Sequence, residues 1–102
     1  MLIVKIYSNE LSVPGEANKI AKANNFVVKA YKFDAQKEDL RKPRIVRIGA
    51  VQNSAAAPTN APISEQRDAM FSKIANIVEA AGAASVNVLC LQEAWSEFTE
   101  RE

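Results

Sequence analysis

The sequence contains no histidine and a single cysteine, Cys90, among its 102 residues. Histidine is the commonest metal ligand and the commonest general base in proteins, so its absence removes both roles at once. One cysteine cannot form an internal disulfide, and the chain has no pair of cysteines at a metal-binding spacing. We therefore expect no metal site and no cofactor, in a protein suited to a reducing compartment.

The sequence also lacks a long hydrophobic run and an excess of one charge. The apolar stretch at residues 2–7 is interrupted by Lys5 and is too short for a signal peptide or a membrane span. Thirteen basic and twelve acidic residues give a formal net charge of +1, which is not the electrostatic signature of a nucleic-acid-binding protein. The densest basic cluster follows two acidic residues and is interpreted as a solvated linker; it comprises Arg41, Lys42, Arg44 and Arg47. We expect a cytoplasmic protein without nucleic-acid or membrane partners.

The first 43 residues are predicted to form an N-terminal extension. Residues 2–7 are interpreted as a brief strand or as an apolar arm. Ser12 is a candidate cap and Pro14 a first-turn residue of a short helix, which Asn24 and Asn25 end because asparagine tolerates the left-handed conformation. Residues 34–43 are polar and charged, as is typical of a linker.

The main fold is predicted to begin with a strand, a helix and a second strand. Residues 44–53 are mostly β-branched and apolar, and Gly49 indicates that a neighbouring element approaches closely. Residues 62–81 have an apolar face with helical spacing, with Asn60 or Ala61 as the expected cap and Gly82 as the expected end. Residues 86–92 form a second apolar strand. Two such strands joined by a helix predict a right-handed βαβ unit, an α/β fold.

Both strands have the near-continuous apolar pattern of strands that are covered on both faces. A single substantial helix cannot cover both faces, so the unit is expected to belong to a larger sheet. Met70 and Phe71 on the helix are interpreted as core residues. Cys90 lies within the second strand and is also interpreted as a buried, inert core residue.

Glu93 is the candidate functional residue of the sequence. It follows the second strand directly, and α/β proteins place working groups just beyond the carboxyl ends of parallel strands. The alternative is a surface glutamate, because any strand that leaves a core must reach polar residues. Position alone does not choose between these two interpretations.

Three segments resemble the carbon–nitrogen hydrolase (nitrilase) superfamily. They are Arg44-Ile-Val-Arg-Ile-Gly-Ala-Val-Gln-Asn-Ser54, Ala61-Pro-Ile63 and Leu91-Gln-Glu-Ala-Trp95. The upstream stretch from Ile20 to Phe33 is similar to an N-terminal extension that ordinary nitrilases lack. Within the superfamily, this combination resembles the enzymes that hydrolyse N-carbamoyl-β-alanine.

The resemblance implies a four-layer αββα sandwich, of which residues 44–102 are the N-terminal part, in a subunit that forms homo-oligomers. It also implies a Glu–Lys–Cys triad that splits an N-carbamoyl amino acid, here into β-alanine, carbon dioxide and ammonia in pyrimidine catabolism. Glu93 matches the glutamate of the triad, the general base that converts a thiol into a thiolate. We expect such a base to be partly buried.

The sequence departs from the family pattern after Glu93. No lysine follows it, Cys90 precedes it, and residues 96–102 do not continue the family motif. The expected function is therefore that of an N-terminal fragment of a hydrolase that is inactive alone. The alternative is a non-catalytic interaction module that docks on full-length subunits.

Overall fold

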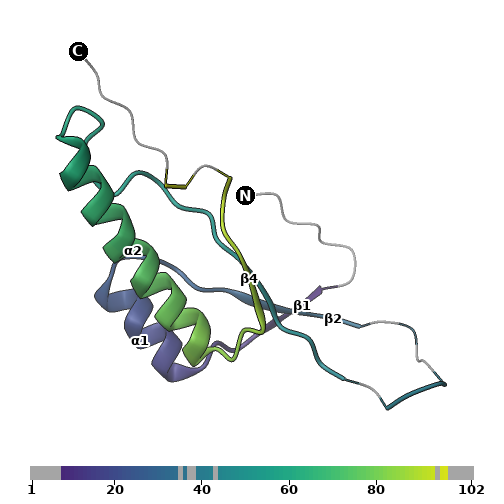
Figure 1. The fold of residues 1–102 in the computed structure, drawn as a ribbon. Helices are drawn as coiled ribbons and strands as arrows, with labels where there is room; N and C mark the ends of the chain where they lie inside the picture. The colour runs from purple at the N-terminus through teal and green to yellow at the C-terminus, as the bar shows by residue number, and fades with distance from the viewer. Residues whose placement is uncertain (1–7, 35, 37–38, 43, 94, 97–102) are drawn as a thin grey trace.

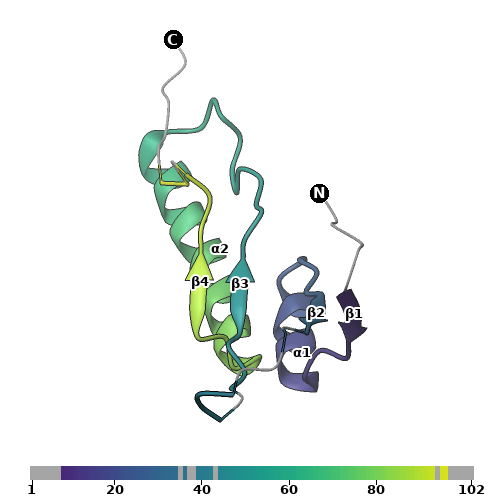
Figure 2. The same ribbon diagram turned by 90° about the vertical axis from the view of Figure 1, so that its right-hand side faces the viewer.

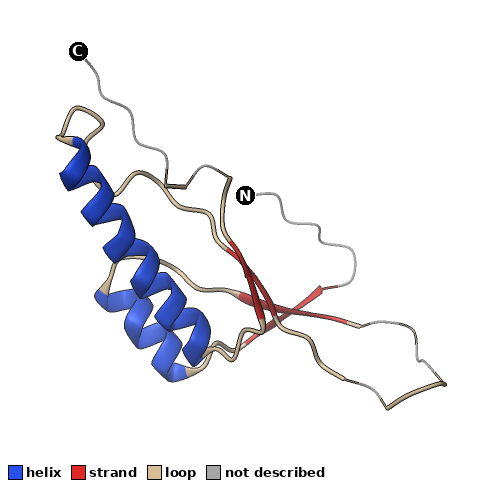
Figure 3. Ribbon diagram, in the orientation of Figure 1, coloured by secondary structure: helices blue, strands red, loops and turns tan. Residues whose placement is uncertain are grey.

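The architecture consists of two small sheets on one side of two helices. The computed structural model describes residues 8–34, 36, 39–42, 44–93 and 95–96. Figure 1 shows the elements along the chain and Figure 3 shows them by type. In order they are β1 (Ser8–Leu11), α1 (Gly15–Ala23), β2 (Ala30–Phe33), β3 (Ile48–Ala50), α2 (Ile63–Ala83) and β4 (Val88–Cys90).

The predicted βαβ unit is confirmed. Strands β3 and β4 are parallel neighbours, with Gly49 opposite Leu89 at the centre of the register, and α2 forms the crossover between them. Figure 2 shows this pair of strands in front of α2. Both strands are shorter than predicted, because their backbone pairing extends only from Arg47 to Val51. At the second of these limits, the Val51 N–H donates to the Cys90 carbonyl over 2.9 Å.

One face of the β3–β4 sheet is exposed. Gly49 and Leu89 are half-buried, whereas the alternate residues on both strands are exposed, including Ile48 (70%) and Val88 (51%). An uncovered face is what the sequence predicts for two strands with a single substantial helix, and the larger sheet stays a prediction. The face is uncovered because α2 covers a single face and no other described element lies on the opposite one.

Gly49 allows β3 and β4 to pack closely, as predicted. A Cβ atom at this position would lie 2.8 Å from Cδ1 of Leu89 and 3.2 Å from Cγ1 of Val86. Real Cβ atoms essentially never make a contact as short as 2.8 Å, so a side chain here would displace the neighbouring strand or its leucine. The glycine thus sets the spacing of the sheet on its inner face.

Helix α2 contributes three of the five buried apolar residues in the described part of the chain. Met70, Ile74 and Ala80 are buried. Met70 and Ile74 lie on the face predicted from the spacing, whereas Ala80 was not predicted and Val78 of the predicted face is 48% exposed. Gln66 is also buried, and its Nε2 donates to the carbonyl of Ala61 over 2.7 Å, which ties the first turn to the preceding loop. The polar side chain is therefore satisfied where it would otherwise destabilise the core.

The ends of α2 differ from the predictions. The cap position is Pro62 and not Asn60 or Ala61, and it makes no side-chain hydrogen bond. Gly82 lies inside the helix, which ends at Ala83 with Ala84 at the cap position, and Ser85 takes the left-handed conformation with φ of 61°. Phe71 is 48% exposed and is not a core residue, because it lies one position away from Met70 on the helix surface.

The N-terminal elements form a second small sheet. Strands β1 and β2 pair antiparallel, with Ser8 opposite Phe33 and Leu11 opposite Ala30. The predicted helix in this region is present, but Pro14, not Ser12, occupies its cap position. The expected end is confirmed: Asn24 bonds back to the Ile20 carbonyl over 2.8 Å, and Asn25 has a φ of 57°.

Helix α1 packs against α2. Its buried residues, Ala17 and Ala21, are one turn apart on one face, and their small side chains permit close approach of the helices. Beyond the end of α1, the Asn76 Nδ2 donates to the Asn24 Oδ1 over 2.9 Å. These contacts attach the N-terminal elements to the βαβ unit.

Residues 34, 36 and 39–42 contain no helix or strand, in agreement with the predicted linker. Residues 44–47 were predicted as the start of the strand, but β3 begins only at Ile48. The predicted strand at residues 2–7 and the boundary at Pro43 lie outside the described residues. The boundary between the extension and the main fold stays a prediction. Among the described residues, neither helix is both long and apolar enough to cross a membrane.

Candidate functional site

Glu93 lies in a turn directly after β4, at the edge of the sheet where both parallel strands have their carboxyl ends. The sequence dictates this location, because the apolar run of β4 and Leu91 stops at Gln92. The side chain of Glu93 is exposed, so the expected partial burial of the base is not found in this chain. An exposed carboxylate at this edge is accessible to a ligand or to another part of a protein.

The loops that follow β3 and β4 are joined to one another. The Asn53 backbone N–H donates to the Gln92 Oε1 over 2.6 Å, one residue before Glu93. This bond continues the pairing of the two strands beyond their last backbone hydrogen bond, with a side chain as the acceptor. This hydrogen bond therefore fixes the position, relative to the end of β3, at which the chain turns into Glu93.

The side chain of Asn53 points into the fold beneath this edge. Its Nδ2 donates to the Ser54 carbonyl over 3.3 Å and contacts the Met70 Sδ at 3.5 Å. Its Oδ1 is buried and has no hydrogen-bond partner within the described part of the chain. A buried acceptor without a donor costs about 1–3 kcal/mol, so this edge of the sheet has an unsatisfied polar group next to the candidate residue.

Trp95 attaches the other side of the turn to α2. The ring of Trp95 meets that of Phe71 edge to face, with centroids 5.8 Å apart and an interplanar angle of 61°. Such pairs contribute about 0.5–1.5 kcal/mol beyond the area they bury. Glu93 thus lies between two contacts, one made by Gln92 and one by Trp95.

Cys90 is not the buried residue that was predicted. It is exposed, because it lies on the uncovered face of the β3–β4 sheet together with Ile48 and Val88. It comes three residues before Glu93, at the end of β4. The described residues contain no group of three or more histidine, cysteine, aspartate or glutamate side chains that could hold a metal ion.

The supporting residues of this site were only partly visible in the sequence. The sequence showed that the amides Gln52 and Asn53 end the predicted strand. It did not predict the hydrogen bond between Asn53 and Gln92, because that bond depends on the register of β3 against β4. The pairing of Phe71 with Trp95 joins positions that no sequence spacing connects. A signal did exist for Phe71: it breaks the spacing of the buried face of α2.

Comparison with known proteins identifies a relative of this chain. No protein-family model matches it. The β-ureidopropionase of Arabidopsis thaliana is 46% identical over 87 residues, which are 85% of this chain but 21% of that protein. A stretch of 87 residues among 102 must include residues 16–87, so it contains β2, β3 and α2. The chain is therefore similar to a fragment of β-ureidopropionase, which confirms the resemblance predicted from its motifs.

Proposed function

We propose that residues 44–102 are the N-terminal part of a carbon–nitrogen hydrolase domain and that Glu93 is its general base. The observation that carries the proposal is the position of Glu93 in the turn after β4, at the carboxyl edge of a parallel pair. Ligands of open α/β sheets bind at this edge. The similarity to a fragment of β-ureidopropionase supports the same reaction class.

In the proposed reaction, Glu93 accepts the proton of a cysteine thiol. The thiolate attacks the carbamoyl carbon of N-carbamoyl-β-alanine, and a lysine ammonium stabilises the oxyanion that forms. When the oxyanion collapses, a carbamoyl C–N bond breaks and Glu93 returns its proton to the leaving nitrogen. Water then cleaves the C–S bond and restores the thiol. One water is consumed overall, and β-alanine, carbon dioxide and ammonia are released, a step of pyrimidine catabolism. The chemistry needs no cofactor.

The nucleophile and the ammonium group are not assigned to residues 1–102. Cys90 is on the outer face of the sheet, and every lysine precedes Glu93 in the sequence. We infer that these residues alone do not hydrolyse the substrate. Incubation of purified residues 1–102 with N-carbamoyl-β-alanine is expected to release no ammonia above background.

We further propose that the exposed face of the β3–β4 sheet packs against a second sheet in a four-layer αββα sandwich. Ile48 and Val88 are exposed on this face, and side chains of this kind form the core between two packed sheets. A second sheet would also bring polar groups to the carboxyl edge. It would partly bury Glu93 there, as a general base near neutral pH requires.

A chimera tests the catalytic proposal. The segment of the Arabidopsis β-ureidopropionase that corresponds to this chain is replaced by residues 1–102, and release of β-alanine is measured. Glu93→Gln is expected to lower kcat by about 100-fold or more, because it removes the base and keeps the shape of the side chain. Glu79→Gln, at an exposed position on α2, is the matched control and is expected to leave kcat unchanged. Equal activity of the two variants would reject the role of Glu93.

The second candidate function is that of a non-catalytic module that docks on full-length subunits of such an enzyme. The uncovered apolar face of β3 and β4 favours it, because exposed apolar patches and open strand edges are typical of interaction sites. Sedimentation of residues 1–102 mixed with full-length β-ureidopropionase tests it. A shared boundary that Ile48→Lys abolishes would support docking, and two independent boundaries would contradict it.

A further inference from the structure

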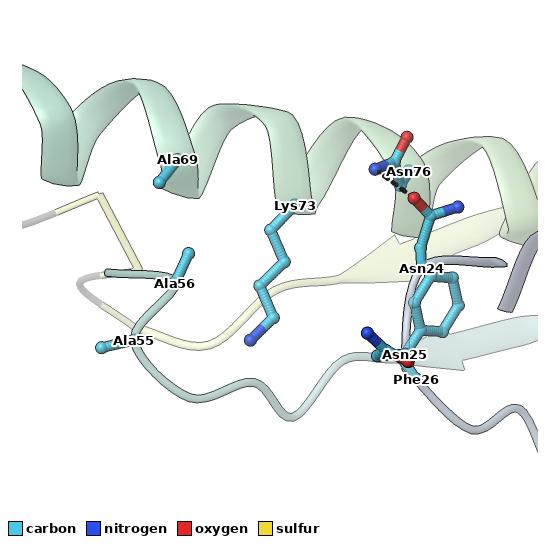
Figure 4. Close-up of a pocket in the computed structure, with 8 residues that line it drawn as sticks. All are labelled: Asn24, Asn25, Phe26, Ala55, Ala56, Ala69, Lys73 and Asn76. Carbon is cyan, nitrogen blue, oxygen red and sulfur yellow. Dashed lines mark hydrogen bonds between the residues drawn. The ribbon is translucent and has the colours of Figure 1, made fainter. Parts of the chain in front are cut away.

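A pocket lies between the two helices and the loop that follows β3. Its volume is about 290 Å³, and three segments line it: residues 24–26 after α1, the loop residues 55 and 56, and one side of α2 at Ala69, Lys73 and Asn76. Figure 4 shows these side chains around the space between the helices and the loop. A volume near 300 Å³ is at the lower end of the range for small-molecule sites.

Lys73 supplies the one charge of this pocket. Its Nζ donates to the Ser54 carbonyl over 3.0 Å and lies 3.3 Å from the Ser54 Oγ, so the flexible side chain is held in a defined position. An ammonium group has three N–H donors, and the two contacts with Ser54 leave one for a ligand. Among the described residues, Lys73 faces no carboxylate.

Asn25 provides a second donor opposite Lys73. Figure 4 shows its amide nitrogen turned toward the same space as the Lys73 ammonium. Its side chain makes no hydrogen bond within the described part of the chain. The side chain of the neighbouring Asn24 already has partners: its Oδ1 accepts from Asn76 and its Nδ2 donates to the Ile20 carbonyl. The unused donors at the pocket are therefore the Lys73 ammonium and the Asn25 amide N–H₂ group, and the Asn25 amide oxygen is an unused acceptor.

The acceptors at the end of α1 do not compete for these donors. The carbonyls of Ile20 and Ala21 accept from the backbone N–H groups of Asn24 and Phe26. The rest of the lining is apolar, with the Phe26 ring on one side and the methyl groups of Ala56 and Ala69 on the other. A cationic donor and a neutral donor beside an apolar wall match a carboxylate that carries a short hydrocarbon chain.

We propose that this pocket binds a small organic carboxylate. The carboxylate accepts from Lys73 Nζ and Asn25 Nδ2, and its hydrocarbon part lies against Phe26 and Ala69. Inorganic phosphate offers oxygens to the same donors but leaves the apolar wall without contact, so it binds more weakly. The site is independent of Glu93 and of the proposed hydrolase reaction.

Nuclear magnetic resonance of residues 1–102 with butyrate tests the proposal. Saturable chemical-shift changes are expected at residues 25, 26, 55, 56 and 73 at millimolar butyrate. Butyramide has nearly the same shape but no charge, and inorganic phosphate has charge but no hydrocarbon part; both are expected to bind at least about tenfold more weakly. No saturable change with butyrate, or equal binding of either analogue, would overturn the proposal.

Variants identify the residues that bind the probe. Lys73→Met keeps an apolar side chain of similar length without the charge and is expected to weaken butyrate binding at least about tenfold, whereas Lys22→Met on exposed α1 is expected to have no effect. Asn25→Gly retains the left-handed backbone and the Lys73–Ser54 contact, and is expected to weaken binding severalfold. Asn25→Asp places an anion beside Lys73 and should abolish binding. Unchanged affinity in Asn25→Asp would overturn the proposal even if Lys73→Met failed to fold.

Discussion

The two halves of the chain both contain a strand, a helix and a strand, yet they form opposite kinds of sheet. In residues 8–33 the helix has 9 residues and the strands pair antiparallel. In residues 48–90 the helix has 21 residues and the strands pair parallel. A parallel pair needs a crossover that returns the chain to the start of the sheet, and a helix of 21 residues, about 31 Å long, can do this.

The two regions also differ in the side chains that their sheets expose to solvent. Strand β1 reads Ser-Asn-Glu-Leu and is mostly polar, although Leu11 and Phe33 of its sheet are exposed. Strands β3 and β4 place Ile48, Val88 and Cys90 on an exposed face. The comparison teaches that the N-terminal half is attached through its helix, whereas the βαβ half carries a surface suited to a further layer.

The largest expected effect is on the core of α2. Ile74 is 6% exposed, and Ile74→Ala is expected to lower the free energy of unfolding by about 2–5 kcal/mol, because it removes buried methylene groups and leaves a cavity. Urea denaturation followed by circular dichroism measures it. Val78→Ala, at a position 48% exposed on the same helix, should change stability by no more than about 0.5 kcal/mol. Equal losses would contradict the assignment of the core.

The attachment of the N-terminal half is tested next. Ala21 is 2% exposed on α1, and Ala21→Leu is expected to cost about 1–3 kcal/mol, because the larger side chain does not fit between α1 and α2. Ala23→Leu, at an exposed position two residues away, is the control and should be nearly neutral. A neutral Ala21→Leu would show that the two halves do not pack through this face.

Two glycines should respond in opposite directions to the same substitution. Gly49→Ala is expected to destabilise the βαβ half by about 1 kcal/mol, since the new Cβ would lie 2.8 Å from Leu89. Gly82→Ala is expected to stabilise it by about 0.5–1 kcal/mol, because Gly82 is inside α2 and no atom lies within 4 Å of the new Cβ. Chemical denaturation of both variants measures the difference. Changes of the same sign would contradict the close approach at Gly49.

The smallest effect on stability is expected for substitutions of exposed apolar residues. These substitutions also compare the two sheets most directly. Ile48→Lys, at a position 70% exposed, is expected to change the unfolding free energy by about 0.5 kcal/mol or less and to reduce self-association in sedimentation velocity. Phe33→Lys on β2, at a position 68% exposed, is the matched variant and should leave association unchanged. A larger effect of Phe33→Lys would assign the interaction surface to the N-terminal sheet.

Much of the βαβ half follows from its sequence alone. The spacing of Met70, Ile74 and their neighbours identified α2 and its buried face, and the apolar runs on either side identified β3 and β4. Gly49 indicated the close approach of a neighbouring strand. These features are predictable because each depends on the periodicity or the shape of local side chains.

Other features were not predictable from local pattern. Strand β1 has a polar sequence, and it exists because β2 offers a partner for its backbone. The predicted caps at Ser12 and Gly82 were wrong. Helix α1 begins after Pro14 and α2 continues past Gly82, because tertiary contacts also decide where a helix begins and ends. Phe71 and Cys90 were assigned to a core because they are apolar, but the number of layers in a protein decides whether an apolar residue is covered.

For Glu93 the sequence determined its place after a strand, and its motif predicted the role of a base. The tertiary structure decided what surrounds it: Gln92 bonded to Asn53, Trp95 on Phe71, and an open edge in front of the carboxylate. Position along a strand is a local property, set by the order of apolar and polar residues. Exposure depends on which segments fold against that edge, and strand register and helix packing decide this.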